Sequence, residues 1–497
     1  MRNRGRPAIM GAFSLFLAFT IGLPNSAAVT VADFAPLVRV SGDNPYASCP
    51  PAEARPGVEY PSAEVEPQIA VDPTTIGTVR GGHLVGVWQQ DRWSNGGAQG
   101  IVAGISSDGG RTWRQVPLPF STCVPGGLGY NRASDPWVAI GPDRTVYASA
   151  VGVIVDVHAS QVGLNARVAL GGVVSAVSHD GGSTWSALQT LPNSAGGGDG
   201  AHVVVDPGRS GVAYMVWTRS QTTLLSRTVD SGKSWSTPRA VVFRSPHHQN
   251  QGGFRIAVDG RTHVLHDIGE IFRNLRRTTT CCQVNGRRQC GQVLSFNEFV
   301  VESSSSDAGM HWSKPEVVGR VHPLLQGRTP AVRDPNSLDV AMDSTTGRLY
   351  ALWEDAGASG GRYKGMLISS SGDGGRHWSR PRGVPIPPKQ DVVIPALAVA
   401  ANGAVGVSYY TLPLTGPHPS HLPTDYWFAR SHDQGRHFDP TVHLAGPFDL
   451  TTAPMHSFVG DYQGLTAVGN TFQPFFAMAN SGDTANPTDI FSTAVSP

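Results

Sequence analysis

The sequence predicts an all-β protein, a β-propeller of four-stranded antiparallel blades, and three observations lead to that prediction. An eight-residue pattern recurs six times between Ser106 and Phe438: hydroxyl, any, Asp, any, Gly, any, any, aromatic. Strand-sized apolar runs bounded by Gly, Pro and Asp precede each copy. After the N-terminal segment, no long stretch has helical periodicity. A lone four-stranded sheet leaves two bare faces and two edges, so the repeated sheets are expected to pack radially.

The recurring pattern has the chemistry of a tight turn between two strands. Its Asp carboxylate can accept the backbone N–H groups that follow it, and its Gly supplies a left-handed conformation. Its aromatic residue buries surface at the start of the next strand. Because catalytic groups are not repeated six times in one chain, we interpret these aspartates as structural. They are Asp108, Asp180, Asp230, Asp307, Asp373 and Asp433.

A larger repeat surrounds the pattern and defines seven units, of which the first six carry it. The seventh unit has three strands before the chain ends, and the run Leu37–Val40 is predicted to supply its outer strand and close the ring. We therefore expect a propeller over residues 65–497, preceded by an N-terminal segment at 29–64 that takes part in closure. Seven blades are favoured, and a six-bladed ring is the alternative.

The six copies resemble the Asp-box, or bacterial neuraminidase repeat, of the sialidase-like β-propeller superfamily. The resemblance implies a glycosidase of the exo-α-sialidase type, although similar boxes occur in other glycoside hydrolases and in binding receptors. Sialidases of this kind are six-bladed and carry a Phe/Tyr-Arg-Ile-Pro segment before the first box. The matching stretch here, Val65-Glu66-Pro67-Gln68-Ile69, has no arginine, and Phe254-Arg255-Ile256-Ala257 lies three units later without the proline.

Composition and the N-terminus indicate an exported protein without a charged macromolecular partner. Lys plus Arg is 38 against 37 for Asp plus Glu, which gives no global attraction to nucleic acid or anionic lipid. Residues 1–28 combine three arginines, an apolar run and a small-residue site, as a signal peptide does; an uncleaved membrane anchor is the alternative. We expect a secreted or periplasmic monomer, with no stable membrane insertion after cleavage and no cofactor.

Five cysteines fit an oxidising compartment. Cys49 and Cys123 are candidates to pair, and one of Cys281 and Cys282 is a candidate to bridge to Cys290. The last three lie in a basic insertion at about 273–292, which we expect to be a solvated, disulfide-clamped loop. Three thiols without clustered histidines do not favour a metal site, and none is predicted.

The candidate active site follows from the topology, since the boxes mark one face of the ring and loops of the other face converge on the axis. By analogy with the resembling sialidases, an arginine clamp would hold a substrate carboxylate, a Tyr activated by Glu would be the nucleophile, and an Asp the acid/base. The catalytic candidates are Asp91, Asp135, Glu354 and Tyr462. The substrate-binding candidates are Arg92, Arg132, Arg255, Arg333, Asp334 and Asp461.

These assignments rest on loop position and chemistry, and each has a structural alternative. Arg132 with Asp135, and Arg333 with Asp334, can equally form salt bridges between blades. Arg255 can be a polar residue of an inner strand, and Tyr462 can pack against a neighbouring loop. The sequence thus predicts a secreted glycoside hydrolase acting on sialylated or other acidic glycans. The alternative is a non-catalytic propeller that binds a glycan or protein.

Overall fold

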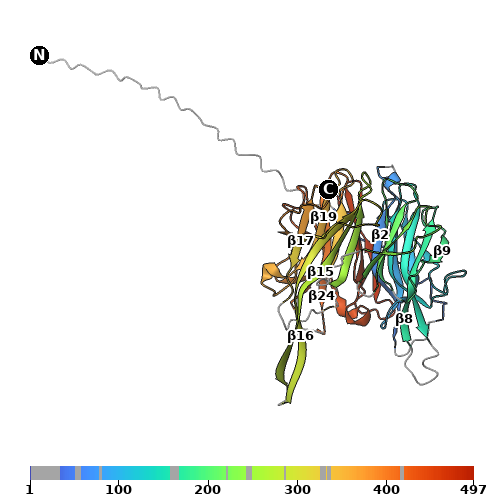
Figure 1. Cartoon of the computed structure of the whole chain (residues 1–497), viewed down its shortest axis with the longest axis horizontal. Helices are drawn as coiled ribbons and strands as arrows, with labels where there is room; N and C mark the ends of the chain where they lie inside the picture. Colours follow the sequence, from blue (N-terminus) through green and yellow to red (C-terminus); the bar gives the residue numbers. More distant parts are fainter. Residues whose placement is uncertain are drawn as a thin grey trace. The chain divides into compact units, whose positions relative to one another are not determined.

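The computed structural model is built from strands, as the sequence predicts (Figure 1). It describes Met1 and residues 34–496 except 51–56, 78–80, 157–166, 197, 220–221, 242–248, 285–286, 325–331, 333–336 and 415–418; the side chains of 156, 167–168, 249–253 and 274–296 are also outside the description. Within these ranges the helices are single 3-10 turns, and none has the length or apolarity of a membrane span. They are Pro73–Thr75, Gly357–Ser359, Leu450–Thr452 and Pro454–His456.

The described strands pair in antiparallel groups of four. Four of these groups are separate sheets, and the other twelve strands form one sheet in which three such groups are linked by single residue pairs. The first three groups are β2 (Glu59–Val71), β3 (Leu84–Trp93), β4 (Ala98–Ser106) and β5 (Arg114–Leu118); β6 (Arg132–Ile140), β7 (Val146–Asp156), β8 (Arg167–Ser178) and β9 (Ser186–Thr190); and β10 (Asp199–Val205), β11 (Ala213–Arg219), β12 (Thr222–Thr228) and β13 (Arg239–Ala240). The next two are β14 (Gln249–Val258), β15 (Leu265–Val284), β16 (Arg287–Ser305) and β17 (Glu316–Val321); and β18 (Leu338–Met342), β19 (Leu349–Asp355), β20 (Gly365–Ser371) and β21 (Arg382–Gly383). The last two are β22 (Gln390–Val399), β23 (Val405–Pro413), β24 (Pro423–Ser431) and β25 (Val442–Asp449); and β26 (Gly464–Val468), β27 (Thr471–Ala479), β28 (Thr488–Ser492) and β1 (Val38–Arg39).

The first strands of these groups form the inner wall of a ring. Consecutive inner strands contact one another in the order β2, β6, β10, β14, β18, β22 and β26, and β26 contacts β2 again. Apolar clusters fill the space between neighbouring sheets, such as the cluster that β3, β4, β7 and β8 share. The all-β, propeller-type architecture with four-stranded antiparallel sheets is therefore confirmed. The blade number stays a prediction, and this cyclic contact order supports seven.

The ring closes where the two ends of the described chain meet. β1 pairs antiparallel with β28, with Val38 opposite Ser492, in the outer position expected for Leu37–Val40. Further along the same edge, β28 touches the first blade: Thr488 Oγ1 donates to the Glu64 carbonyl at 2.8 Å and accepts from the Glu64 N–H at 2.9 Å. The N-terminal strand and the last blade are thus joined to the first.

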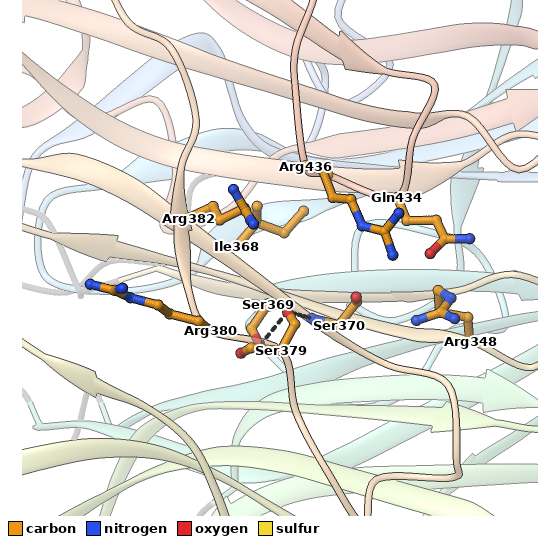
Figure 2. Close-up of a pocket in the computed structure, with 10 residues that line it drawn as sticks. Arg348, Ile368, Ser369, Ser370, Ser379, Arg380, Arg382, Gln434 and Arg436 are labelled. Atoms are coloured by element: carbon orange, nitrogen blue, oxygen red, sulfur yellow. Dashed lines mark hydrogen bonds between the residues drawn. The ribbon is translucent and has the colours of Figure 1, made fainter.

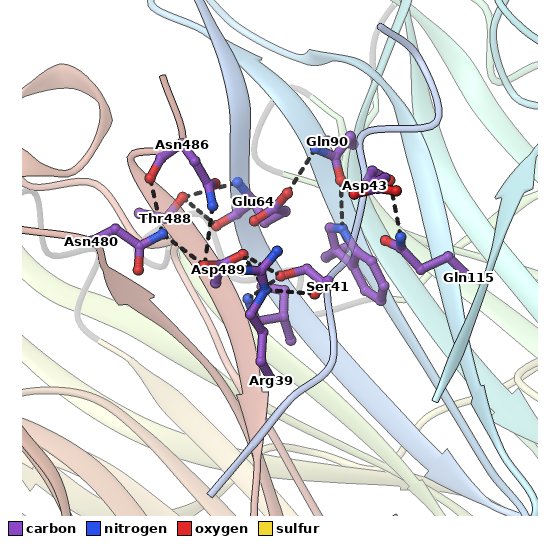
Figure 3. A network of polar contacts seen from close by, with 12 residues as sticks. Arg39, Ser41, Asp43, Glu64, Gln90, Gln115, Asn480, Asn486, Thr488 and Asp489 are labelled. Atoms are coloured by element: carbon purple, nitrogen blue, oxygen red, sulfur yellow. Dashed lines mark hydrogen bonds and ion pairs between the residues drawn. The ribbon is translucent and has the colours of Figure 1, made fainter. Parts of the chain in front are cut away.

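A polar network around Asp489 holds this junction together (Figure 3). The Asp489 carboxylate accepts from Ser41 Oγ at 2.8 Å and from Asn480 Nδ2 at 2.7 Å, and Arg39 Nε lies 3.1 Å from it. Glu64 nearby accepts from Gln90 at 2.8 Å, and burial, followed by the charge of Asp489, raises its pKa well above the usual range.

The six boxes are the turns that the sequence predicts. In the second box, Asp180 Oδ1 accepts from the Thr184 N–H at 2.9 Å and from Ser178 Oγ at 2.7 Å, while Ser178 Oγ accepts from the Gly182 N–H at 2.8 Å. The Gly182 φ is 91°, a left-handed value that glycine adopts without strain. Each box joins the third and fourth strands of its group, and the Gly109 N–H of the first box bonds to Gly82 in the β2–β3 turn at 3.0 Å. The boxes and the turns after the first strands therefore lie on one face, which we call the box face.

The cysteines give one confirmation and one correction. Cys49 and Cys123 form a disulfide, as expected. The segment 273–292 is not a loop: β15 and β16 continue through it as a long antiparallel hairpin that extends beyond the other strands (Figure 1), with Cys281 opposite Cys290. Its run of threonines, cysteines and valine favours extended backbone, which explains the correction. A bridge to Cys290 falls on side chains outside the description.

Candidate active site at the ring axis

A repeated irregularity in the inner strands positions the candidate site. The ladder register shifts in β2, β6, β10, β14 and β22 at a similar distance from the box face. In three of these bulges a residue with positive φ precedes proline: Glu66 (55°), Asp135 (53°) and Ile394 (54°). Proline has no N–H to donate to a ladder, so Pro67, Pro136 and Pro395 favour a bulge at these points. Equivalent positions of neighbouring blades therefore carry the carboxyl groups of Glu66 and Asp135.

Glu66 and Asp135 form an interacting pair of carboxyl groups. Glu66 is only 2% exposed, and burial, then the charges of Asp135 and Asp461, raise its pKa well above the usual range. A hydrogen bond to Asp135 raises it further, as expected when Glu66 holds the proton. Asp135 accepts from the Gly200 N–H at 3.1 Å and from Ser134 Oγ at 2.9 Å. Two carboxyl groups from neighbouring blades thus interact at one level of the ring.

Polar side chains of β3 surround the Glu66 carboxyl. The Gln89 amide donates to Glu66 Oε2 and also to Ser134 Oγ, and its own oxygen accepts from Arg92 Nη1 at 2.7 Å. The Arg92 guanidinium also lies over the Phe458 ring, 4.9 Å from its centre. Arg92 thus acts on Glu66 through Gln89 and through its charge, which lowers the Glu66 pKa against the larger effects above.

Tyr462 lies beside this pair, and the described contacts of its hydroxyl do not involve Glu354, its predicted partner. The Tyr462 hydroxyl donates to the Pro136 carbonyl at 2.8 Å, and its ring is 5.2 Å from that of Trp137. Burial, then the charges of Glu66, Asp135 and Asp461, raise its pKa well above the usual range. A nucleophilic tyrosine needs the opposite shift. The hydroxyl of Tyr462 is engaged by Pro136, so the pairing with Glu354 as nucleophile and activator stays a prediction without a contact to support it.

Glu354 belongs to a separate buried group. It accepts from Lys364 Nζ at 2.8 Å and from the Ile394 N–H at 3.0 Å. Burial, then the charges of Glu298 and Glu354, raise the pKa of Glu270. Burial also raises the pKa of Glu298 to about 6. Glu354 is therefore held by a lysine and a backbone amide rather than by the tyrosine.

Arg255 is part of a layer that crosses the ring axis on the box-face side of the carboxyl pair. Trp137, His202, Arg255 and Asp339 are each the fourth residue from the end of their inner strand. The Trp137 and His202 rings are 4.0 Å apart, Arg255 Nη1 lies 3.5 Å from His202 Nδ1, and Arg255 Nε lies 3.5 Å from Asp339 Oδ1. Burial, then Arg255, lowers the His202 pKa well below the usual range, so the ring is neutral. Arg255 is paired within this layer, and its place in a substrate clamp is not supported.

On the box-face side of this layer, a channel of about 390 Å³, lined mainly by apolar residues, runs along the axis. Residues of β2, β6, β10, β14, β18 and β26 line it, and its lining includes Pro207, Gly260 and Ser344 from turns of the box face. The axial layer separates this channel from the carboxyl pair.

Arg132 and Asp91 contact other protein groups at the end of the ring opposite the box face. The Arg132 guanidinium lies 3.8 Å from the Trp93 ring centre and donates to Asn95 Oδ1 at 2.9 Å, and burial lowers its pKa to about 10. Asp91 accepts from Asn44 Nδ2 at 2.8 Å and from the Ser62 N–H. These contacts tie the N-terminal segment and the 93–97 turn to the first blade. They give both residues a structural role.

Two candidates, Arg333 and Asp334, lie outside the described residues. Of the described candidates, Asp135, Asp461, Tyr462 and Arg92 come together around Glu66, whereas Arg255, Arg132, Asp91 and Glu354 have partners elsewhere. Among the described side chains, no group of three or more His, Cys, Asp or Glu is arranged to hold a metal ion.

The sequence can now be compared with known proteins. The model of the BNR repeat-like domain matches residues 152–407, more than half of the 497-residue chain. The chain belongs to the BNR repeat-like domain family. Comparison of this BNR repeat-like chain with curated proteins gave no match.

Solved structures with a related architecture include three enzymes that act on carbohydrates. The NanB sialidase of Streptococcus pneumoniae is 10% identical, with a TM-score of 0.41 over 72% of this chain and 66% of its own. An α-L-arabinanase of Penicillium chrysogenum is 11% identical, with a TM-score of 0.42 over 72% and 92%. An ulvan lyase of polysaccharide lyase family PL25 is 14% identical, with a TM-score of 0.43 over 87% and 95%. At these TM-scores we draw no inference about the site of the BNR repeat-like chain from them.

Glu66 is the residue of this site that the sequence reasoning missed. The signal is the alignment of Glu66-Pro67 with Asp135-Pro136 at the start of the first two units of the BNR repeat-like chain. An acidic residue before proline at the same register in adjacent blades predicts two carboxyl groups at one level of the ring. Both residues begin an apolar run, so the sequence pattern alone assigns them to strands rather than to a site.

Proposed function

We propose that this protein is an exported glycoside hydrolase whose carboxyl pair Glu66–Asp135 is the acid/base of the reaction. The observation that carries the proposal is the pair itself: two carboxyl groups at the same register of adjacent inner strands, where burial, then the charges of Asp135 and Asp461, raise the Glu66 pKa well above the usual range. A carboxyl group kept protonated at neutral pH can donate to the oxygen of a glycosidic bond. The Cys49–Cys123 disulfide supports an oxidising compartment.

Asp461 completes the proposed mechanism as a second carboxylate. Glycosidases place their two carboxyl groups roughly 5–9.5 Å apart, on either side of the sugar, so two groups in hydrogen-bond contact act as one proton-sharing unit. Asp461 is half-buried and acts electrostatically on both Glu66 and Tyr462. In our proposal Glu66–Asp135 protonates the leaving group, and Asp461 stabilises the oxocarbenium-like transition state or assists water.

We propose that the substrate is a glycan, and the assay decides whether its sugars are acidic or neutral. Three carboxyl groups gather at the site, whereas Arg255 is paired with Asp339 and Arg132 with Asn95. The three-arginine clamp implied by the sialidase resemblance therefore has little support among the described arginines. A sialoside remains one arm of the assay, beside other acidic and neutral glycosides.

The test is hydrolysis of a panel of fluorogenic glycosides by the full chain and by Glu66→Gln, Asp135→Asn and Asp43→Asn. Asp43 is an exposed aspartate of the N-terminal segment and is the matched control. We expect the first two variants to lose about a hundredfold or more in kcat/KM, as general acid/base catalysis typically contributes, and the control to keep full activity. Tyr462→Phe is expected to keep kcat within severalfold, because its hydroxyl is engaged by Pro136.

A second candidate, a non-catalytic glycan-binding propeller, is favoured by one observation. Glu66 is 2% exposed and Tyr462 9% exposed, so little of either side chain faces solvent. Inactivity on the whole panel, together with glycan binding that survives Glu66→Gln, would establish this candidate instead.

A further inference from the structure

A recess lined by arginines lies between the fifth and sixth blades, on the box face (Figure 2). Its volume is about 120 Å³. Arg348 comes from the turn before β19, Arg380 and Arg382 from the segment leading into β21, and Arg436 from the sixth box. Four arginine residues from three separate segments thus line one small space. In Figure 2, Gln434 and Ser370 lie near Arg436 and Arg348, whereas the Arg380 side chain extends away from them.

None of these four guanidinium groups has a protein partner among the described residues. No acidic side chain lines the recess, and none of the four forms an ion pair or side-chain hydrogen bond. Elsewhere in the chain arginines are paired, as Arg430 is with Asp439 at 2.9 Å. Asp343 is the acidic residue whose pKa responds to Arg348, but its carboxylate accepts the N–H groups of Thr345 and Thr346 and lies outside the lining.

Four unpaired positive charges around one space repel one another, so an anion there would stabilise the fold. Guanidinium forks match the oxygens of sulfate and phosphate in two-point hydrogen bonds. The Ser370 hydroxyl and the Gln434 amide add neutral donors at the same recess. A recess of this volume is large enough for several waters or for one tetrahedral oxoanion.

We propose that this recess is a second binding site, specific for a tetrahedral oxoanion, which is a sulfate or phosphate group either free or esterified to a glycan. It lies on the box face, away from the carboxyl pair, and does not depend on the proposed glycosidase activity. An ester-borne group would anchor an anionic glycan to this face.

The test measures binding of inorganic sulfate, inorganic phosphate and a sulfated disaccharide to the full chain by calorimetry at constant ionic strength set with chloride. The variants are Arg436→Gln, Arg348→Gln and the matched control Arg111→Gln. Arg111 holds the same place in the first box as Arg436 in the sixth, but its Nη1 donates to the Asp108 carbonyl at 2.8 Å. Circular dichroism verifies that each variant is folded.

We expect saturable one-to-one binding, weakened about tenfold or more by Arg436→Gln and Arg348→Gln and unchanged by Arg111→Gln. If the free ions compete with the sulfated disaccharide, the tighter of the two identifies the natural source. If only the disaccharide binds, the source is a glycan ester. Absence of saturable binding by all three probes overturns the proposal. Equal losses in Arg436→Gln and Arg111→Gln also overturn it, because they would show a general charge effect.

Discussion

At the scale of the residue, burial divides the carboxyl groups of this chain into two kinds. The box aspartate Asp180 is held by the backbone and hydroxyl of Thr184 and by Ser178, which together outweigh its slight desolvation and lower its pKa to about 2. Glu66 loses water almost completely and faces other carboxylates, so its pKa rises. The same functional group therefore holds a turn in the boxes, where its pKa is lowered, and lies buried at Glu66, where its pKa is raised.

The buried ion pair of the axial layer gives a prediction about stability. Arg255 and Asp339 have side chains 15% and 20% exposed, and burial lowers the pKa of Arg255. Removing one partner leaves the other charge uncompensated, so we expect Asp339→Asn to lower the free energy of unfolding by about 3 kcal/mol. The double variant Arg255→Met/Asp339→Leu should cost clearly less. Urea unfolding measures the free energy of unfolding of the single and double variants. If the loss in the double variant equals the sum of the losses in the two single variants, the pairing is refuted.

At the scale of the element, the boxes make the fold sensitive to acid. The pKa values of Asp180, Asp373 and Asp433 are lowered to about 2, below the ordinary value of 3.8. The folded state therefore binds these protons less readily than the unfolded chain. The stability that the boxes contribute is full above about pH 4 and is lost as the pH falls through about 2.

Thermal unfolding across that range tests the prediction. Wild type should lose stability steadily between about pH 4 and 2, and Asp180→Asn should show a shallower loss from a lower starting value. Buried carboxyl groups such as Glu66 act in the opposite direction, so the comparison between the variant and wild type is the informative quantity. An identical slope in both would mean that the box carboxylate does not contribute to the acid transition.

The disulfide between the N-terminal segment and the first blade supplies a second prediction at this scale. Cys49 and Cys123 are 74 residues apart, and closing a loop of that length removes unfolded-state entropy worth about 4 kcal/mol at most. We expect Cys49→Ser/Cys123→Ser to lower the Tm in the absence of reductant. Adding reductant should lower the Tm of wild type toward that of the variant. A reductant effect of the same size in the variant would assign it to the other cysteines.

At the scale of the whole molecule, the ring is closed by side chains as well as by strands. Asp489 joins Arg39 and Ser41 of the N-terminal segment to Asn480 of the last blade. Asp489→Ala leaves several buried donors unpaired, so we expect a loss of about 2–4 kcal/mol. Because closure is shared, amide exchange should accelerate at Val40, which bonds to Ile490, and also along β2 and β26. The control Asp43→Ala, at an exposed aspartate of the N-terminal segment, should change neither quantity. Acceleration confined to β1 would contradict shared closure.

The sequence predicts the ring better than the site for a physical reason. Turns and strands follow local rules, so the boxes, the outer strand at Leu37–Val40 and the Cys49–Cys123 pair were within reach. Partners across the axis depend on how neighbouring blades pack, which no local pattern encodes. Arg255 pairs with Asp339 and Tyr462 with Pro136 for that reason, and the sialidase analogy could not anticipate either contact. The cysteines and arginines at 273–292 favour a solvated loop, whereas the threonines and valine favour extended backbone, and the structure follows the second preference.

The most direct test of the central claim is an infrared titration of the protonated carboxyl band. The difference between wild type and Glu66→Gln isolates the Glu66 contribution from other buried carboxyl groups such as Glu64 and Glu270. At neutral pH we predict a protonated carboxyl in that difference. Burial, then the charges of Asp135 and Asp461, raise the Glu66 pKa, so Asp135→Asn removes one of these causes and is expected to weaken the band. If the protonated carboxyl band of Glu66 is absent at neutral pH, both in wild type and in Asp135→Asn, the proton-sharing pair is contradicted.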